Sequence, residues 1–149
     1  MYIISGNDSL PENQTSRFQK NLDWVFKLDL TTFEIIRRAP IPEARQAFGI
    51  CSIGKYIYVA GGLNNDISLD SVHRYDCELN CWEELAQKLP FPAYAFNLIT
   101  VEKRWIFGFG MTHNDINSKV SRLITLDTWN LTEGWKVTEI ESEFSTACC

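Results

Sequence analysis

Short apolar runs, separated by polar segments that contain glycine, predict β-strands along the whole chain. The clearest run is YIYVA at residues 56–60, which ends at Gly61-Gly62 and is followed by the polar stretch 64–66. Runs rich in β-branched and aromatic residues and bounded by such turn signals are typical of strands. Helical spacing of apolar residues is not sustained over a window of about 11 residues anywhere. The pattern therefore predicts an all-β protein.

One phrase of this pattern occurs three times. In each copy a hydrophobic strand ends at glycine, at residues 2–6, 58–62 and 106–110. The second strand of each copy ends in an aspartate, namely Asp29, Asp76 and Asp127. A turn and a bulky apolar residue follow each aspartate, and the aspartates are 47 and 51 residues apart. A period of about 50 residues predicts a repeat architecture in which each repeat is one small sheet.

The middle copy resembles the repeat of the kelch family. After Arg45 it carries, in order, a strand, the pair Gly61-Gly62, the pair Tyr75-Asp76, and Trp82, six residues after the aspartate. The outer copies keep this order and depart from it at single positions. Ser5 and Phe109 stand in place of the first glycine, Leu28 and Leu126 in place of the tyrosine, Ile35 in place of the tryptophan, and Tyr94 in place of the arginine. The resemblance covers almost the whole chain.

The resemblance implies a fold: an all-β, kelch-type β-propeller with about three four-stranded blades, as part of a larger six- or seven-bladed ring. Blade 1 is expected over about residues 1–43 without its first strand, blade 2 over about 44–92 and blade 3 over about 93–142. Residues 143–149 are expected to start a next blade.

Three blades are fewer than the four to eight of closed propellers, and two explanations stay open. We favour a piece of a longer propeller chain. Otherwise the blades close with a different protein or with a second copy. In that last case the tail of one chain supplies the first strand of the other chain's first blade, which gives three plus three blades.

The repeated residues have physical roles in such a fold. A blade buries both faces of its sheet against its neighbours, so large aromatic residues are needed between blades. Tyr75, Trp82 and Trp135 suit that role. The turn from Asp76 to Asn80 is expected to close a hairpin, because these side chains hydrogen-bond to their own backbone.

Composition and charge exclude several classes of partner. The chain has 149 residues, of which 45% are hydrophobic and 22% charged, as in ordinary globular proteins. Its net charge is −5 and its longest basic run is Arg37-Arg38, so the sequence offers no basic footprint for nucleic acid or anionic lipid. The five cysteines lack the spacing of a secreted disulfide scaffold, and no signal-peptide pattern is present. We therefore expect a cytoplasmic location, and the resemblance adds association with the cytoskeleton or the cilium.

Two patterns could carry chemistry, and neither is convincing. Residues 108–113 begin like G-x-G-x-x-G, but His113 replaces the third glycine. His73, Cys77 and Cys81 are spaced four apart, but they lie on a predicted strand and turn, and a fourth zinc ligand is not apparent. The sequence predicts no catalytic residue, no metal and no cofactor, so we expect a protein that is not an enzyme.

The remaining functional candidates are loops. The resemblance implies that the loops between the second and third strands of a blade, and the connections between blades, form a rim that faces the ligand. The expected loops are 7–23, 63–70 and 111–121, and the expected connections are 39–45 and 89–94. Residues predicted to be exposed there for contact with a protein partner are Arg45, Asn64, Asn65, Asp66, Tyr94, His113, Asn114 and Asp115.

The function that follows is a non-enzymatic protein–protein interaction module, with an adaptor or scaffold role, that presents its rim loops to a protein partner. Two alternatives stay open. One is a structural subunit of a large cytoskeletal, ciliary or other assembly. The other is a propeller-fold enzyme, an oxidase or an epimerase, whose active site lies outside this stretch.

Overall fold

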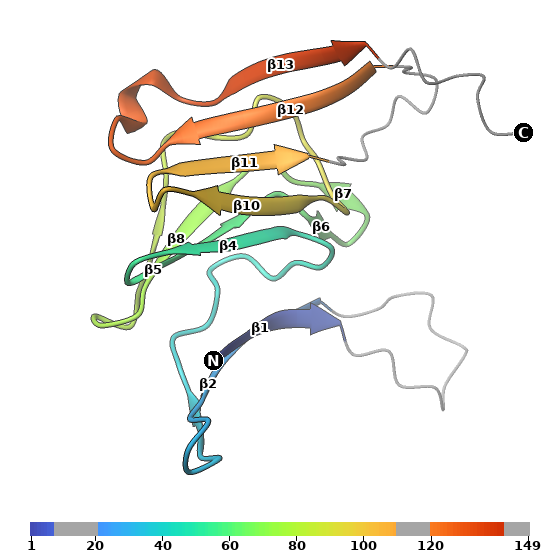
Figure 1. The fold of residues 1–149 in the computed structure, drawn as a ribbon. Helices are drawn as coiled ribbons and strands as arrows, with labels where there is room; N and C mark the ends of the chain where they lie inside the picture. Colours follow the sequence, from blue (N-terminus) through green and yellow to red (C-terminus); the bar gives the residue numbers. More distant parts are fainter. Residues whose placement is uncertain (8–20, 110–119, 142–149) are drawn as a thin grey trace, which may run out of the picture.

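A computed structural model of the chain describes residues 1–7, 21–109 and 120–141 (Figure 1). In these ranges the regular structure consists of antiparallel strands and one short 3-10 helix, η1 (Leu131–Glu133). The predicted all-β class is therefore confirmed. In the described ranges no helix has the length and apolar character to cross a membrane.

Three sheets follow one another along the chain, and we call them blades 1, 2 and 3. Blade 1 contains β1 (Tyr2–Asn7), β2 (Asn21–Leu28) and β3 (Ile35–Arg37). Blade 2 contains β4 (Gly49–Ile53), β5 (Tyr56–Ala60), β8 (Val72–Asp76) and β9 (Cys81–Glu84). Blade 3 contains β10 (Asn97–Val101), β11 (Trp105–Phe109), β12 (Val120–Asp127) and β13 (Lys136–Glu141).

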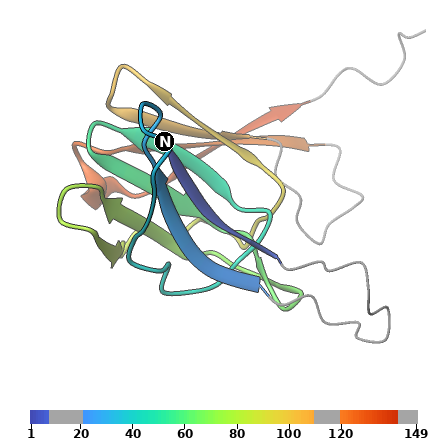
Figure 2. The ribbon, with the colours of Figure 1, turned by 90° about the horizontal axis from the view of Figure 1, so that it is seen from below.

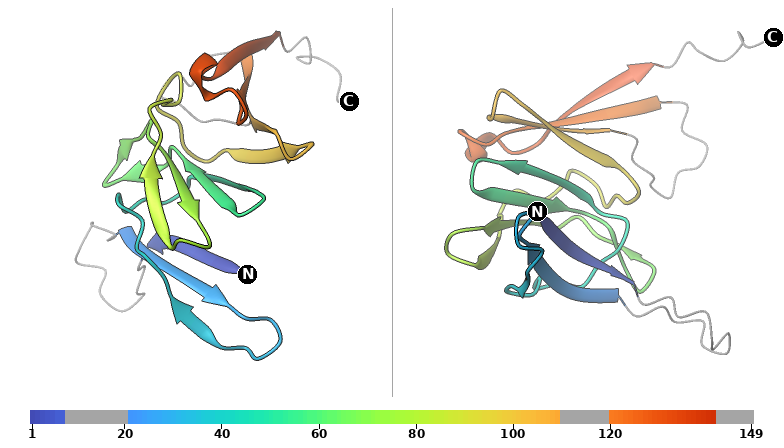
Figure 3. Two further views of the ribbon diagram at one scale, coloured as in Figure 1. Left: turned by 90° about the vertical axis from the view of Figure 1, so that its left-hand side faces the viewer. Right: turned by 60° about the horizontal axis from the view of Figure 1, so that its bottom comes forward.

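The blades form an open arc. Seen from below and from the side, the three sheets are stacked face to face in chain order, with blade 2 in the middle (Figures 2 and 3). Each strand is hydrogen-bonded to the next strand of its blade, as in a meander. A separate two-stranded hairpin, β6 (Leu63–Asn64) and β7 (Ile67–Ser68), projects between β5 and β8.

The apolar core lies between blades 2 and 3. Tyr58 and Ala60 of blade 2 share one cluster of buried side chains with Leu98, Ile106 and Ile124 of blade 3. These residues alternate along their strands with residues on the opposite face, as expected for sheets that are covered on both sides.

The aromatic residues predicted to lie between blades do so. Tyr75 is fully buried and its ring lies 4.9 Å from that of Trp82. The indole Nε1 of Trp82 donates a hydrogen bond across to the carbonyl of Ala39, in the connection from blade 1, at 2.9 Å. Trp135 repeats this contact one blade later, with a 3.2 Å hydrogen bond to the carbonyl of Gln87.

The aspartate turns are also as predicted. Asp76 Oδ1 accepts hydrogen bonds from the backbone N–H groups of Glu78 and Leu79, both at 2.9 Å. Asp29 and Asp127 accept equivalent backbone bonds at the same place in blades 1 and 3. Each aspartate thereby closes the turn between the last two strands of its blade.

The alignment of Phe109 with Gly61 is wrong by one residue. The structure pairs the first residue of the second strand with the aspartate in both blades, Tyr56 with Asp76 and Trp105 with Asp127. Counting from these pairs, Phe109 corresponds to Ala60. The cause is the preceding loop, which has three residues, 102–104, in blade 3 and two, 54–55, in blade 2.

The alignment of Tyr94 with Arg45 is also wrong by one residue. Ala47 and Ala95 both have a φ of 52° and both stand two residues before the first strand of their blade. Counting back from them, Arg45 corresponds to Ala93, and both residues are completely buried. Tyr94 stands one position further along and is only half-buried.

Candidate partner-binding rim

The β6–β7 hairpin carries the most exposed of the predicted contact residues. Asn65 and Asp66 form its two-residue turn, with φ values of 47° and 67°. Two successive residues with positive φ are the requirement of a type I′ turn, which asparagine and aspartate tolerate well. Both residues are exposed, and the next residue, Ile67, has 67% of its surface exposed. The turn therefore presents two polar side chains beside one apolar side chain.

Backbone hydrogen bonds hold this hairpin to its surroundings. Leu63 and Gln46 exchange bonds of 2.8 and 3.0 Å, which join β6 to the connection before β4. Leu69, just after β7, bonds to the carbonyl of Gly62 at 2.9 Å and accepts a bond from Ala93 at 3.0 Å. From blade 1, the side chain of Asn21 donates to the carbonyl of Leu63 at 3.0 Å. The exposed turn is thus carried by a base that two blades and two connections hold.

Arg45 is not exposed, and that part of the prediction is wrong. Its guanidinium lies beneath the rim with 0% exposure and donates to the carbonyl of Gly61 at 2.9 Å. It also contacts Glu43 Oε2 at 2.7 Å, Ser71 Oγ at 2.9 Å and His73 Nδ1 at 3.0 Å. Each of these partners satisfies a donor that water would otherwise have to satisfy, which is why a charged residue can be buried here.

His73 is neutral in this network. Arginine has only donors, so the His73 Nδ1 that faces it at 3.0 Å must accept, and the ring proton must reside on Nε2. Burial lowers the pKa of His73 below its usual 6.5, and the positive charge of Arg45 lowers it further, while Glu84 and Glu43 act in the opposite direction. Protonation would place two cations side by side in a buried site.

The free energy of unfolding should therefore depend on the protonation of His73 below about pH 6.5. Because the pKa is lower in the folded state, this contribution is complete above 6.5 and is lost as the pH falls toward the lowered pKa. In His73→Gln the amide oxygen can still accept from Arg45 but does not titrate. We expect urea unfolding to show a smaller loss of stability between pH 7 and 5 for this variant than for the wild type. Parallel pH curves would contradict this assignment.

The other predicted contact residues differ in accessibility. Asn64 is half-buried, and its Oδ1 is 3.5 Å from the Asn21 side chain. Tyr94 is half-buried between Ala93 and Ala95, whose backbone groups bond to Gly62 and Ala47. His113, Asn114 and Asp115 lie outside the described residues. Partner contact by these residues stays a prediction.

Two rim residues escaped the sequence analysis. Ile67 could have been noticed as the apolar residue directly after the Asn-Asp turn. Asn21 is over nine-tenths buried, and its Oδ1 has no hydrogen-bond partner among the described residues. No feature of the sequence marks it, because its burial depends on contact with β6 from another blade.

The described ranges contain no group of three histidine, cysteine or acidic residues that could hold a metal ion. His73 is hydrogen-bonded to Arg45, Cys77 is a free thiol in the turn between β8 and β9, and Cys81 is a free thiol at the first residue of β9. The rim is therefore a surface of loops whose chemistry is that of recognition: hydrogen-bonding side chains and an exposed aliphatic group on a fixed base.

Comparison with known families finds one matching description. A family model described as "Kelch motif" matches residues 44–88, which is blade 2 with its preceding connection. "Kelch-like protein 41" of Homo sapiens is 33% identical over 117 residues, 77% of this chain, and "Kelch-like protein 33" of Homo sapiens is 42% identical over 95 residues, 64% of this chain. "Kelch domain-containing protein 10" of Homo sapiens is 38% identical over 81 residues.

These relatives are much longer proteins. The chain spans 18% of the length of the first and 16% of the second. Among solved structures, the one titled "Structure of YjhT" superposes with a TM-score of 0.66 at 17% identity, over 84% of this chain and 47% of that chain. The likeness in three dimensions thus extends over all three blades, and the predicted propeller fold is confirmed.

Proposed function

The chain belongs to the kelch-repeat family, and we propose that it is a protein-interaction module whose contact surface is the rim around the β6–β7 hairpin. The observation that carries the proposal is the exposure of Ile67 on a turn whose base is anchored to two blades. Single exposed apolar side chains are common on protein surfaces, so Ile67 supports the proposal through its position beside two polar turn residues on an anchored hairpin and not through exposure alone. Asn65 and Asp66 beside it can supply the hydrogen bonds that give such a contact its specificity.

A fixed base makes this surface suited to binding. Loops that are ordered before binding lose little conformational entropy when a partner docks, so more of the contact energy appears as affinity. Tyr94 contributes a half-buried aromatic ring in the neighbouring connection. Partner classes that require a basic surface, nucleic acid and anionic lipid, do not match a chain of net charge −5. The proposed partner is a protein, and the proposed compartment is the cytoplasm.

One alternative role has an observation of its own. The outer faces of blades 1 and 3 expose apolar side chains, among them Ile3, Trp24, Ile35, Ile99 and Val101. Such faces favour a role as a structural subunit whose neighbours cover them, in a cytoskeletal or other assembly. A propeller-fold enzyme would need its catalytic residues outside this stretch.

The proposal predicts that Ile67→Asp removes partner binding without unfolding the protein. Leu79 is a matched control, because it has 71% exposure and lies in the turn between β8 and β9, at the opposite end of β8 from the rim. We expect the amount of partner protein that co-purifies with Ile67→Asp to be at least tenfold lower than with the wild type. A tenfold loss corresponds to about 1.4 kcal/mol, and truncating a hot-spot contact costs at least that much. Leu79→Asp should recover them normally.

The readout is quantitative mass spectrometry of co-purified proteins, with thermal melting of each variant alongside. Equal melting temperatures are expected, because both side chains are exposed. Equal loss of partners from both variants, or full recovery with Ile67→Asp, would show that the rim around this hairpin is not the contact surface.

A further inference from the structure

The end of blade 3 that lies opposite the rim carries an exposed tryptophan. Trp129 has 73% of its surface exposed and lies in the turn between β12 and β13. This turn and the loop between β10 and β11 lie at the end of the blade away from β6 and β7 (Figure 1). Tryptophan is largely buried in most proteins, and where it contacts a partner it is among the residues that contribute most to binding.

Hydrogen bonds fix the backbone that carries this ring. The N–H of Trp129 donates to Asp127 Oδ1 at 3.0 Å. The N–H of Thr128 donates to the carbonyl of Arg104 at 3.0 Å, and the Thr128 hydroxyl donates to the same carbonyl at 2.6 Å. The turn is thereby joined to the neighbouring loop, so a partner that docks on the ring has little backbone left to order.

The guanidinium of Arg104 is stacked with the indole of Trp129. Its central carbon lies 5.0 Å from the ring centroid of Trp129 and 4.8 Å from that of Trp105. Its Nε donates to Asp127 Oδ1 at 2.9 Å, and its Nη2 donates to Asp127 Oδ2. The positive charge is therefore paired with a carboxylate, and the guanidinium serves as a flat support for the ring.

Blade 2 shows that this exposure does not come from the place of blade 3 in the arc. Glu78 stands two residues after its turn aspartate, as Trp129 does, and 70% of its side chain is exposed. Lys55 corresponds to Arg104, because each precedes the residue that pairs with the turn aspartate. Its side chain is 38% exposed, against 36% for Arg104. Since blade 2 has a blade on each side, both positions stay open when another blade follows.

The unused polar groups beside the ring are hydrogen-bond donors. Among the described residues, Nε1 of Trp129 and Nη1 of Arg104 have no hydrogen-bond partner. The nearby carboxylates are engaged, because Asp127 accepts from Arg104 and Glu133 accepts from Asn130 at 2.8 Å. A molecule that matches this surface should therefore bring a flat apolar group and hydrogen-bond acceptors.

We propose that Trp129 and Arg104 bind a proline-containing segment of a partner protein in the polyproline II conformation. A proline ring stacks on an aromatic face, and proline has no N–H that would need an acceptor. The polyproline II helix has no internal hydrogen bonds, so its carbonyls are free to accept from Trp129 Nε1 and Arg104 Nη1. The inference does not rest on the rim. Proteins held by this surface should co-purify normally with Ile67→Asp.

Binding of decaproline to the full chain, followed by NMR, tests the proposal. The five tryptophans give five indole N–H resonances. We expect the resonance that is absent from Trp129→Glu to shift most on addition of decaproline. This variant should fold, because Glu78 occupies the same position in blade 2. It should bind decaproline about tenfold more weakly than the wild type, as expected for the loss of a central aromatic contact.

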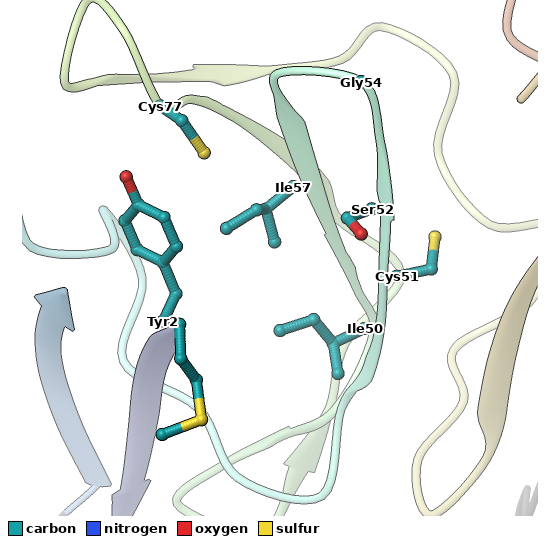
Figure 4. Close-up of a pocket in the computed structure, with 8 residues that line it drawn as sticks. Tyr2, Ile50, Cys51, Ser52, Gly54, Ile57 and Cys77 are labelled. Carbon is teal, nitrogen blue, oxygen red and sulfur yellow. The ribbon is translucent and has the colours of Figure 1, made fainter. Parts of the chain in front are cut away.

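An open groove between blades 1 and 2 is another apolar surface that could take up the probe. Tyr2 lies on one side of it, Ile50 and Ile57 lie on the other, and Cys77 lies at its margin (Figure 4). None of the described residues that line it is a tryptophan. Decaproline bound in this groove would leave the Trp129 resonance in place, so the indole readout separates the two surfaces.

Two further variants make the test specific. Arg104→Lys keeps the ion pair, as Lys55 does with Asp76 in blade 2, but loses the planar stack, and we expect about threefold weaker binding. Leu79→Ala removes an equally exposed apolar side chain from the turn of blade 2 and should bind like the wild type.

Three outcomes would overturn the proposal. The first is no shift of the Trp129 resonance at decaproline concentrations up to about 1 mM, the weak limit of specific binding. The second is equal binding of decaproline by the wild type and Trp129→Glu. The third is equal or tighter binding of a glycine-serine decapeptide or of maltohexaose, which would mean that carbonyls alone, or a sugar ring, are what this surface accepts.

Discussion

Replacing Arg45 with alanine is expected to lower the free energy of unfolding by about 3–5 kcal/mol, the cost typical of removing one partner of a buried ionic network. The guanidinium is completely buried and is the common partner of Gly61, Ser71 and His73. Without it, the carbonyl of Gly61 and the Nδ1 of His73 lose a donor in a place that water does not reach, and a cavity is left. Urea unfolding monitored by tryptophan fluorescence measures the change.

Arg45→Lys is the matched control. It keeps the positive charge next to Glu43, but a lysine ammonium cannot reproduce the planar fork that contacts Glu43, Ser71 and His73 together. We expect the free energy of unfolding of Arg45→Lys to lie between that of the wild type and that of the alanine variant. A loss of less than about 1 kcal/mol in Arg45→Ala would mean that the network does not hold the rim to blade 2.

The burial of Arg45 could not be predicted from the sequence. A charged residue in a loop is exposed by default, and nothing near Arg45 in the sequence indicates otherwise. Its burial depends on Gly61, 16 residues away, and Ser71, 26 residues away, which only the folded blade brings together. The family pattern included the arginine but carried no information on which way its side chain points.

The strands and turns were predictable because their signals are local. The run at 56–60 ends at a double glycine, and Asp76 forms its bonds within three residues of itself. The one-residue error in blade 3 arose where the signal was misleading. Glu102 and Lys103 both adopt positive φ, of 54° and 52°, although neither residue favours that conformation. The residue types in the longer loop therefore gave no indication of its length.

The candidate site was predictable to the same extent. The Asn65-Asp66 turn follows from residue chemistry, and the structure places it on an exposed hairpin. Ile67 was overlooked although it directly follows the turn, whereas Asn21 could not be found because its burial depends on β6 of another blade.

Gly61→Ala is expected to be about as damaging as the loss of Arg45, through a different mechanism. An alanine Cβ at this position would lie 2.3 Å from the carbonyl oxygen of Ala93 and 3.0 Å from side-chain atoms of Leu89 and Phe96. That carbonyl also accepts the 2.8 Å bond from the N–H of Gly62, so it cannot withdraw freely. Left-handed backbone costs about 1–2 kcal/mol for a residue with a Cβ, and overpacking adds about 1–3 kcal/mol.

Gly54→Ala separates these two costs. Gly54 has a φ of 58°, nearly the 59° of Gly61, but a Cβ there meets no atom within 4 Å. The Gly54 variant should therefore lose only the conformational part, about 1–2 kcal/mol. The difference between the two variants in urea unfolding measures the collision with Ala93, and two equal losses would mean that blades 2 and 3 separate without cost.

Blade 1 indicates that the collision, not the φ angle, will decide the outcome. Ser5 occupies the position of Gly61 in blade 1 and has a φ of 57°, so a residue with a Cβ can hold this backbone conformation. Its hydroxyl donates at 2.7 Å to the carbonyl of Arg45, the residue that corresponds to Ala93. The same site therefore accommodates a side chain where blade 1 meets blade 2 and excludes one where blade 2 meets blade 3. Ser5→Ala should accordingly cost only its hydrogen bonds, about 1 kcal/mol, well below the loss in Gly61→Ala.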